Sequence, residues 1–276
     1  MATHRYVVCD VFTDKPLEGN QLAVFTDARE IPEAQLQLLA KEMNFSETVF
    51  VYPPESGGHV RMRIFTPSDE LPFAGHPMLG TAFVLAAPMQ LGVINLETGR
   101  GIVPVTLERD GARIVFGRMK QPVPEIKAFE QTEVLFAALG VTGSTLPVER
   151  YSQGPGHVFV ELESADAVAA LEPDFAALKR ATDGGTVCFA RDGGGWKMRT
   201  FVPGAGVDED PATGSAAGPL ALHLARHEHI AFGDEIEISQ GAEIGRPSTL
   251  YAVAHSPEHI EVGGSAVIVA RGEFRI

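Results

Sequence analysis

One signature occurs twice in this sequence, and the repetition limits the possible folds more than any other feature. Each copy begins with Met-Arg-x-Phe-x-Pro, at Met62–Pro67 and at Met198–Pro203, and continues into a glycine turn and an apolar run. The offset between the copies is about half of the 276 residues. Solenoid repeats are far shorter, roughly 20–50 residues, so we interpret the pattern as two duplicated domains. Pockets form preferentially between domains, where we expect the functional site.

The two glycine turns, Phe73–Ala82 and Asp210–Pro219, lead into helices of unusual composition. The segments Met78–Ala87 and Ala216–Ala225 carry almost no polar residue. A helix that is apolar all round must be buried on all sides, so we expect each to be wrapped by its own domain's sheet. A helix N-terminus offers free N–H groups and partial positive charge. Two such ends facing each other would bind a carboxylate.

Local signals place the starts of these helices. Pro77 suits the first helical position, and Ser215 is a favoured N-cap residue. Pro219 would still be early enough in its helix to cost little hydrogen bonding. The predicted helices therefore begin close to His76 and Ser215, which occupy matching positions in the two copies.

Strand-like segments outnumber helical ones along the chain. The predicted class is α+β, with two duplicated domains, each a curved, mostly antiparallel sheet around a central apolar helix. The proline-rich stretch Gln121–Glu125 is the best linker candidate. We therefore expect a first domain over residues 1–120, a second over 126–264, and a C-terminal strand, about 265–276, that returns to the first.

Composition excludes several functional classes. A net charge of −14 without a dense Lys/Arg stripe argues against a nucleic-acid partner. No apolar run reaches membrane-spanning length, and the N-terminal segment does not resemble a signal peptide. Cys9 and Cys188 form no CxxC pair, which favours a reducing compartment. The expected location is the cytoplasm.

No cofactor site is predicted. His223, His227 and His229 have spacing similar to that of metal ligands, but one helix supplies all three and no matching acidic or Cys ligand is placed nearby, so we expect no metal site. Gly214–Gly218 lacks the Gly-x-Ser-x-Gly spacing of a nucleophile elbow. No phosphate-binding glycine loop follows a strand, so we expect no nucleotide cofactor.

Six blocks, in order along the chain, carry a resemblance to a known family. Together they resemble the PhzF family of phenazine-biosynthesis isomerases, which has the diaminopimelate epimerase-like fold. The resemblance covers essentially the whole chain. The blocks are Glu18–Phe25, Ala40–Val51, Ile64–Ala82, Gly154–Leu162, Asp208–His227 and Gln240–Ser248.

The resemblance implies a role for each site residue. Glu47 would be the acid/base residue, and a carboxyl between Phe45 and Val49 can have a pKa raised toward neutrality. The second copy has Gly184-Gly185-Thr186 in the aligned neighbourhood, which favours a one-base proton shift. The remaining implied substrate-binding residues are Ser46, Gly75, His76, Asp210, Gly214 and Ser215.

The expected function is thus a cofactor-free isomerase acting on trans-2,3-dihydro-3-hydroxyanthranilate as a homodimer. Two alternatives stay open. An amino-acid epimerase of the same fold is disfavoured because neither helix start carries a thiol. A non-catalytic homologue that only binds a small molecule is the second. Taken singly, Glu47 would more often be a solvated loop carboxylate and His76 a packing residue, so the prediction rests on the joint pattern.

Overall fold

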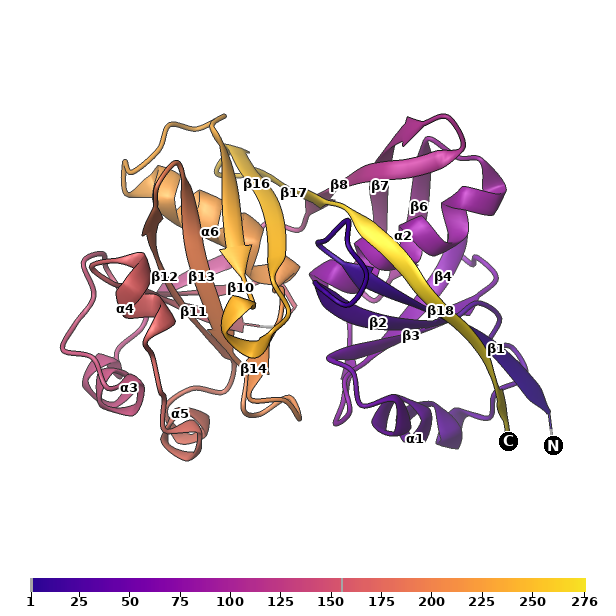
Figure 1. Ribbon diagram of the computed structural model, residues 1–276, viewed down its shortest axis with the longest axis horizontal. Coiled ribbons are helices and arrows are strands. Elements are labelled where there is room, and N and C mark those ends of the chain that lie inside the picture. Colours follow the sequence, from indigo (N-terminus) through magenta and orange to yellow (C-terminus); the bar gives the residue numbers. More distant parts are fainter. Residues whose placement is uncertain (1, 155) are drawn as a thin grey trace.

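The computed structural model describes residues 2–154 and 156–276. Met1 and Pro155, the latter within the block Gly154–Leu162, lie outside the described residues. Figure 1 shows two lobes side by side, one around helix α2 and the other around helix α6, with strands running between them. All described strands belong to one continuous 18-stranded sheet.

The first lobe takes its elements from the N-terminal half and from the last strand. In chain order they are β1 (Thr3–Val11), β2 (Asn20–Phe25), α1 (Glu33–Met43), β3 (Glu47–Tyr52), β4 (Val60–Phe65), β5 (Glu70–Leu71), α2 (Gly75–Met89), β6 (Val93–Thr98), β7 (Gly101–Asp110), β8 (Arg113–Gln121) and β18 (Ala266–Arg275).

The second lobe contains the elements between these. They are β9 (Glu125–Ala128), α3 (Thr132–Leu139), β10 (Glu149–Ser152), β11 (Gly156–Glu161), α4 (Ala165–Ala169), α5 (Phe175–Ala181), β12 (Gly185–Asp192), β13 (Gly195–Phe201), β14 (Glu209–Asp210), α6 (Gly214–Arg226), β15 (Glu235–Gln240), the 3₁₀ turn η1 (Ala242–Ile244), β16 (Ser248–Ser256) and β17 (His259–Gly264).

The strands of the two lobes pair in the same pattern. In the first lobe β2 pairs in parallel with β3, β3 antiparallel with β4, and β4 in parallel with β6. In the second, β11, β12, β13 and β15 repeat this order with the same directions. The register agrees as well, because Ala23 lies opposite Thr48 and Val158 opposite Thr186. Corresponding residues therefore occupy corresponding places beside α2 and α6.

The chain crosses between the lobes twice. Residues 122–124 connect β8 to β9, within the proline-rich stretch. The second crossing leads from β17 to β18. Strand β17 pairs antiparallel with β8, with Val262 opposite Met119, and β18 pairs with β1. Figure 1 shows β18 passing from the second lobe across the first to the C-terminus. The sheet thus continues through the junction of the lobes.

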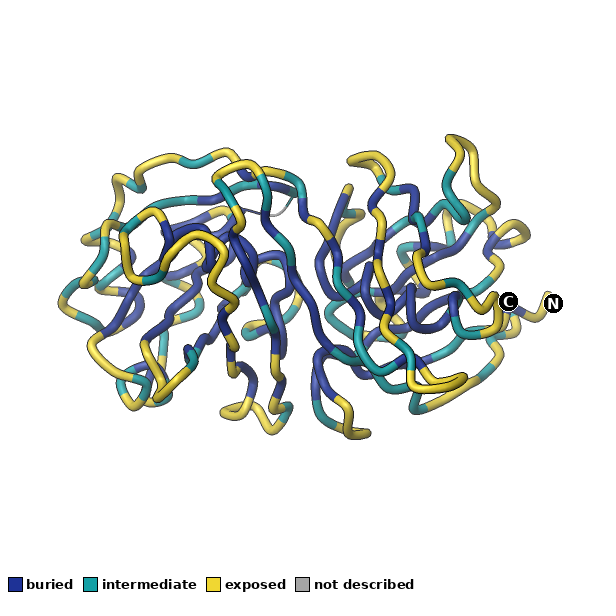
Figure 2. The backbone as a smooth tube through the Cα atoms, turned by 90° about the horizontal axis from the view of Figure 1, so that it is seen from above, coloured by how far each residue is buried: buried dark blue, intermediate teal, exposed yellow. Residues whose placement is uncertain are grey.

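Helices α2 and α6 are the buried centres of their lobes, as their composition predicts. In α2 the run from Gly75 to Val84 is buried without interruption, and in α6 every residue from Gly214 to Ala225 is buried. In Figure 2 the buried backbone is concentrated inside the two lobes and at their junction. Burial of a whole helix in an otherwise small lobe fixes the position of its first turn.

The helix starts differ in detail from the prediction. Helix α2 begins at Gly75, so Pro77 is its third residue, and the N-cap of α6 is Thr213 rather than Ser215. Pro219 lies inside α6 and lacks the N–H that would bond to the Ser215 carbonyl. The Gln153 side chain donates to that carbonyl instead, at 2.8 Å. A side chain from the neighbouring strand region thus replaces the missing helical hydrogen bond.

Strand β12 lies inside the sheet of the second lobe. Residues Gly185 to Ala190 are all buried, and β12 pairs with β11 on one edge and β13 on the other. A strand that is buried on both faces has a continuous apolar sequence without alternation of polar and apolar residues. Periodicity alone cannot distinguish such a run from a buried helical segment.

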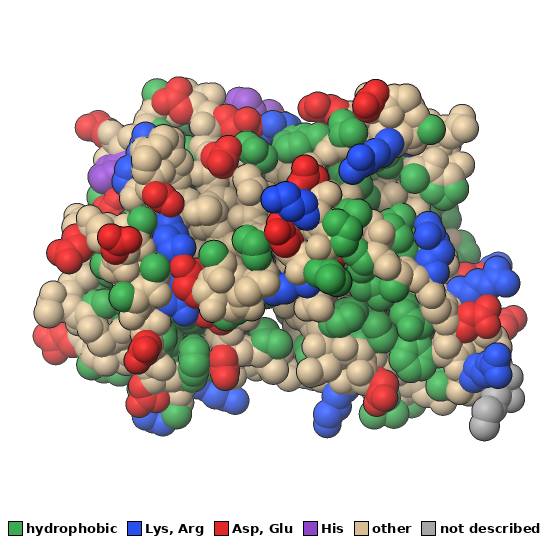
Figure 3. All heavy atoms as spheres, viewed as in Figure 1, with side chains coloured by type: hydrophobic (Ala, Val, Ile, Leu, Met, Phe, Trp, Pro, Cys, Tyr) green, Lys and Arg blue, Asp and Glu red, His purple; other side chains and the backbone are tan. Residues whose placement is uncertain are grey.

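The surface matches the acidic composition. Figure 3 shows Lys and Arg side chains interspersed with Asp and Glu on the displayed face, while apolar side chains gather over the first lobe. Among the helices of residues 2–154 and 156–276, none has the length and apolarity needed to cross a bilayer.

Candidate active site

The starts of α2 and α6 meet at the junction of the lobes, beside a cavity of about 380 Å³. Every residue that the sequence predicts for the site lines this cavity: Ser46, Glu47, Gly75, His76, Asp210, Gly214 and Ser215. The second lobe contributes residues that were not predicted, among them His157, Lys179 and Thr213. The prediction of a pocket formed by both helix starts agrees with this arrangement.

Gly75 and Gly214 allow the two helices to approach each other closely. A Cβ atom on Gly75 would lie 2.4 Å from both the Gly214 carbonyl carbon and the Ser215 nitrogen. A Cβ atom on Gly214 would lie 2.9 Å from the Phe12 ring and 3.1 Å from the His76 nitrogen. Neither contact is compatible with a side chain unless its neighbours move. The N-cap residues Ala74 and Thr213 make no side-chain capping bond, so the N–H groups of the first two residues of each helix remain available to an anion.

Glu47 is the first residue of β3, and its side chain is only 14% exposed. Its Oε2 atom is buried and makes no hydrogen bond within the described chain. Burial, with a smaller contribution from the negative charge of Asp210, raises the pKa of Glu47 well above its ordinary value. A raised pKa makes the protonated carboxyl easier to form, which suits a group that takes up a proton and returns it.

His76, the second residue of α2, lies beside Glu47. Its Nδ1 atom is 3.3 Å from Glu47 Oε2 and 3.3 Å from Asn20 Nδ2. Burial lowers the pKa of His76 to about 4, against the opposing effect of Asp210. The imidazole is therefore neutral at pH 7 and does not form an ion pair with Glu47.

Asp210, at the end of β14, is buried and held by two donors. Asn20 Nδ2 donates to its Oδ1 at 2.8 Å, and Thr213 Oγ1 donates to its Oδ2 at 2.6 Å. Asn20 comes from the first lobe, whereas Asp210 and Thr213 belong to the second. The hydrogen bond from Asn20 thus joins the lobes and orients the carboxylate in the cavity.

Ser215 has a partner that the sequence analysis missed. His157 Nε2 lies 2.9 Å from Ser215 Oγ, and both residues are buried. Burial lowers the pKa of His157 to about 4, so this imidazole is also neutral at pH 7. His157 enters the sequence analysis only as part of the block Gly154–Leu162, and its contact with the second residue of α6 is brought about by the fold.

The two lobes differ at the position of Glu47. Glu47 pairs with Leu22 across β2 and β3, and the corresponding pair across β11 and β12 is His157 with Gly185. A Cβ atom on Gly185 would lie 2.5 Å from His157 Nδ1. The His157 ring therefore fills the space that a second acidic side chain would need. Glu47 thus lines the cavity from the first lobe, and the Ser215–His157 pair lines it from the second.

The two cysteines are core residues. Cys9 and Cys188 are fully buried, and neither lines the cavity. Burial raises the pKa of both thiols, with a further contribution from Asp10 at Cys9. Among the described residues, no cysteine lies at the helix starts, so no thiol is available there for catalysis.

Comparison with known proteins agrees with this description. The model of the family described as phenazine biosynthesis-like protein, PhzC-PhzF, matches residues 9–272. The chain belongs to this family. A trans-2,3-dihydro-3-hydroxyanthranilate isomerase of Pseudomonas aeruginosa is 50% identical over 273 residues, which cover 98% of each chain.

Solved structures with a similar fold range from moderate to low sequence identity to this chain. A structure described as a predicted epimerase of Pseudomonas aeruginosa has a TM-score of 0.85 at 30% identity, covering 98% of this chain and 99% of that one. A hydroxyproline epimerase of Agrobacterium vitis has a TM-score of 0.66 at 13% identity, covering 99% and 91%. The mixed helix-and-strand fold is therefore shared with racemases and epimerases.

Proposed function

We propose that this protein is a trans-2,3-dihydro-3-hydroxyanthranilate isomerase that uses Glu47 as its single acid/base residue. The observation that carries the proposal is the buried Glu47 carboxyl, whose Oε2 atom makes no hydrogen bond among the described residues and for which the second lobe has only Gly185 at the corresponding position. The identity of 50% over nearly the whole chain to an isomerase of that name supports the substrate.

The reaction is a proton shift without gain or loss of atoms. The Glu47 carboxylate removes the proton from ring carbon 3, the ring double bonds move by one position, and the proton is added at carbon 1. The resulting enol tautomerises to an aminoketone, two of which can condense toward a phenazine skeleton. The raised pKa of Glu47 makes its protonated form stable enough to deliver the proton.

The other cavity residues orient the substrate in this proposal. First-turn N–H groups of α2 and α6, with Gly75, Gly214 and Ser215, receive the substrate carboxylate. Asp210, held by Asn20 and Thr213, accepts a charge-assisted hydrogen bond from the amino group. Ser46 lines the same wall as Glu47. The neutral His76 orients the ring or relays a proton.

Solvent-deuterium incorporation tests the reaction class. Incubation with trans-2,3-dihydro-3-hydroxyanthranilate in D₂O should give a rearranged product containing deuterium. Incorporation with inversion alone would support an amino-acid epimerase, and no incorporation would support a binding protein. The mechanism uses no metal or cofactor, so prior dialysis against EDTA should leave turnover unchanged.

The domain organisation and assembly are part of the same proposal. We assign residues 1–120, with the strand at about 265–276, and residues 126–264 to two duplicated domains of the diaminopimelate epimerase-like type. The equivalent strand pairing around α2 and α6 supports this division. A cytoplasmic homodimer is expected from the family resemblance, and light scattering of the purified protein measures its mass directly.

A further inference from the structure

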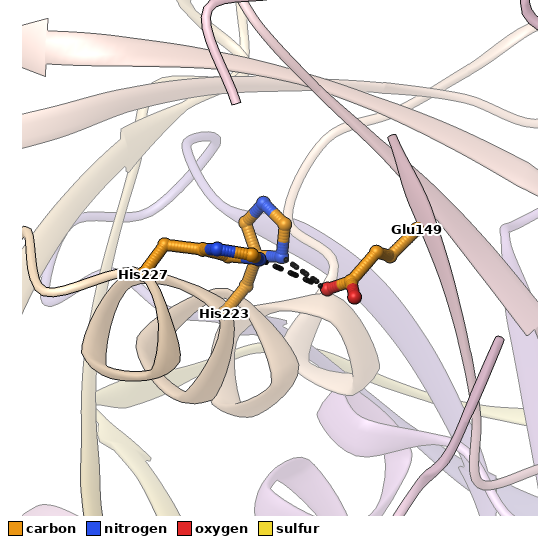
Figure 4. A group of neighbouring side chains, drawn as sticks. All are labelled: Glu149, His223 and His227. Carbon is orange, nitrogen blue, oxygen red and sulfur yellow. Dashed lines mark hydrogen bonds and ion pairs between the residues drawn. The ribbon is translucent and has the colours of Figure 1, made fainter. Parts of the chain in front are cut away.

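A second cluster of ionisable side chains lies outside the cavity. Glu149, on β10, meets His223 and His227 from the C-terminal end of α6, and none of the three lines the cavity of Glu47. Figure 4 shows both imidazoles directed at one carboxylate oxygen. The sequence analysis found the two histidines but no acidic ligand, because Glu149 precedes His223 by 74 residues and reaches it only through the fold.

The ligand atoms are close enough to share an ion. Glu149 Oε2 lies 3.2 Å from His223 Nδ1 and 3.1 Å from His227 Nε2, and the three atoms lie within 4.8 Å of one another. Zinc binds imidazole nitrogen and carboxylate oxygen at about 2.0–2.2 Å. Tetrahedral ligands at such distances are roughly 3.4 Å apart. The cluster therefore needs only small side-chain movements to coordinate a metal.

The orientation of the His223 ring suits metal binding through its Nδ1 atom. His223 is fully buried, and its Nδ1 atom lies 3.2 Å from Glu149 Oε2. Its Nε2 atom is buried and has no hydrogen-bond partner among the described residues. Nε2 can therefore carry the ring proton when Nδ1 donates its lone pair to a metal.

Arg226 competes for the same oxygen. Its Nη1 atom donates to Glu149 Oε2 at 2.7 Å and to the Tyr151 hydroxyl at 2.5 Å. The Arg226 side chain is 32% exposed, so its guanidinium can turn into solvent. Tyr151, which donates to Glu149 Oε2 at 2.9 Å, remains to orient the carboxylate.

We infer that Glu149, His223 and His227 form a binding site for a divalent transition-metal ion such as Zn²⁺ or Co²⁺. Two imidazoles and one carboxylate leave a fourth position for water. The ion would join β10 to the end of α6, where a cation is also favoured by the helix dipole. Ser215 and His223 lie on the same helix about 12 Å apart along its axis, so the isomerase chemistry proceeds without this ion.

The test is a Co²⁺ titration of tag-free protein, followed by visible absorption and by calorimetry with Zn²⁺. We expect one equivalent of Co²⁺ to give the absorption bands of a four-coordinate ion. Loss of an outer-sphere partner alone costs roughly 10–100-fold in metal affinity, so His227→Ala should weaken binding by at least about 100-fold. The His227 side chain is 21% exposed, and thermal unfolding of the metal-free variant shows whether it folds normally.

Three further variants make the test specific. His229→Ala removes a nearby imidazole that lies beside Glu161 and not beside Glu149. His259→Ala disrupts a second His–His–Glu group, formed by His255, His259 and Glu261. Both should bind Co²⁺ like the wild type. Arg226→Gln should bind it several-fold more tightly, because the competing cation is gone. No stoichiometric binding by the wild type, or binding that survives His227→Ala, would overturn the inference.

Discussion

The two lobes present the same backbone to the cavity but different side chains. At the register position where the first lobe has Glu47 opposite Leu22, the second has Gly185 opposite His157. At the second residue of the central helix, the first lobe has His76 and the second has Ser215. A symmetric scaffold thus carries an asymmetric site, which suits a proton shift along one face of a substrate rather than exchange between two equivalent bases.

The largest expected effect comes from replacing Glu47, the proposed base. Glu47→Gln preserves size but cannot accept a proton, and general acid–base groups typically contribute about 10²–10⁴-fold to the rate. Turnover should fall by that factor, while binding of a product-like anthranilate, measured by calorimetry, should persist.

Ser46→Ala is the matched control, because Ser46 precedes Glu47 and lines the same cavity. It should retain turnover within about tenfold. Wild-type turnover in Glu47→Gln would exclude Glu47 from the mechanism and remove the proposed difference between the lobes.

A second expected effect concerns the contact between the helices. Gly75→Ala places a Cβ atom against Gly214 and Ser215, and overpacking of this kind costs about 1–3 kcal/mol. Urea unfolding should show this decrease in the free energy of unfolding. Gly92→Ala, where a Cβ atom would meet no neighbour within 4 Å, should stay within about 0.5 kcal/mol of the wild type. Equal effects of both substitutions would mean that the helix starts are not in tight contact.

The smallest predicted effect is a pH dependence from the second lobe. His157 has a pKa of about 4 in the folded protein against 6.5 for an ordinary histidine, so below pH 6.5 the unfolded chain binds a proton that the folded one does not. Stability present above pH 6.5 is therefore lost as the pH falls toward 4, by about 1.4 kcal/mol per pH unit.

His157→Gln removes this contribution. Between pH 7.5 and pH 5, the free-energy difference between wild type and variant should change by about 2 kcal/mol in favour of the variant. Ser215→Ala, which loses the hydrogen bond but keeps the imidazole, should follow the wild-type pH dependence. The free energies of unfolding of wild type and His157→Gln could instead differ by the same amount at both pH values. That result would contradict a buried, neutral His157.

Much of this arrangement could be predicted because it is encoded locally. The apolar composition of α2 and α6 requires burial, and the repeated glycine turns locate both helix starts. The residues that were missed depend on long-range contacts. His157 is recognised only through Ser215, 58 residues away, and Glu149 only through His223. Strand β12 has no alternation because it is buried on both faces, so periodicity could not identify it.

The most direct test of the one-base mechanism follows a single hydrogen. A substrate labelled with deuterium at ring carbon 3 is converted in H₂O under single-turnover conditions, and the product is quenched and analysed by mass spectrometry and NMR. If Glu47 alone takes the proton and returns it inside a buried cavity, part of the deuterium must appear at carbon 1. Complete loss of the label to solvent, with all product hydrogen at carbon 1 derived from water, would contradict the account and favour two separate proton carriers.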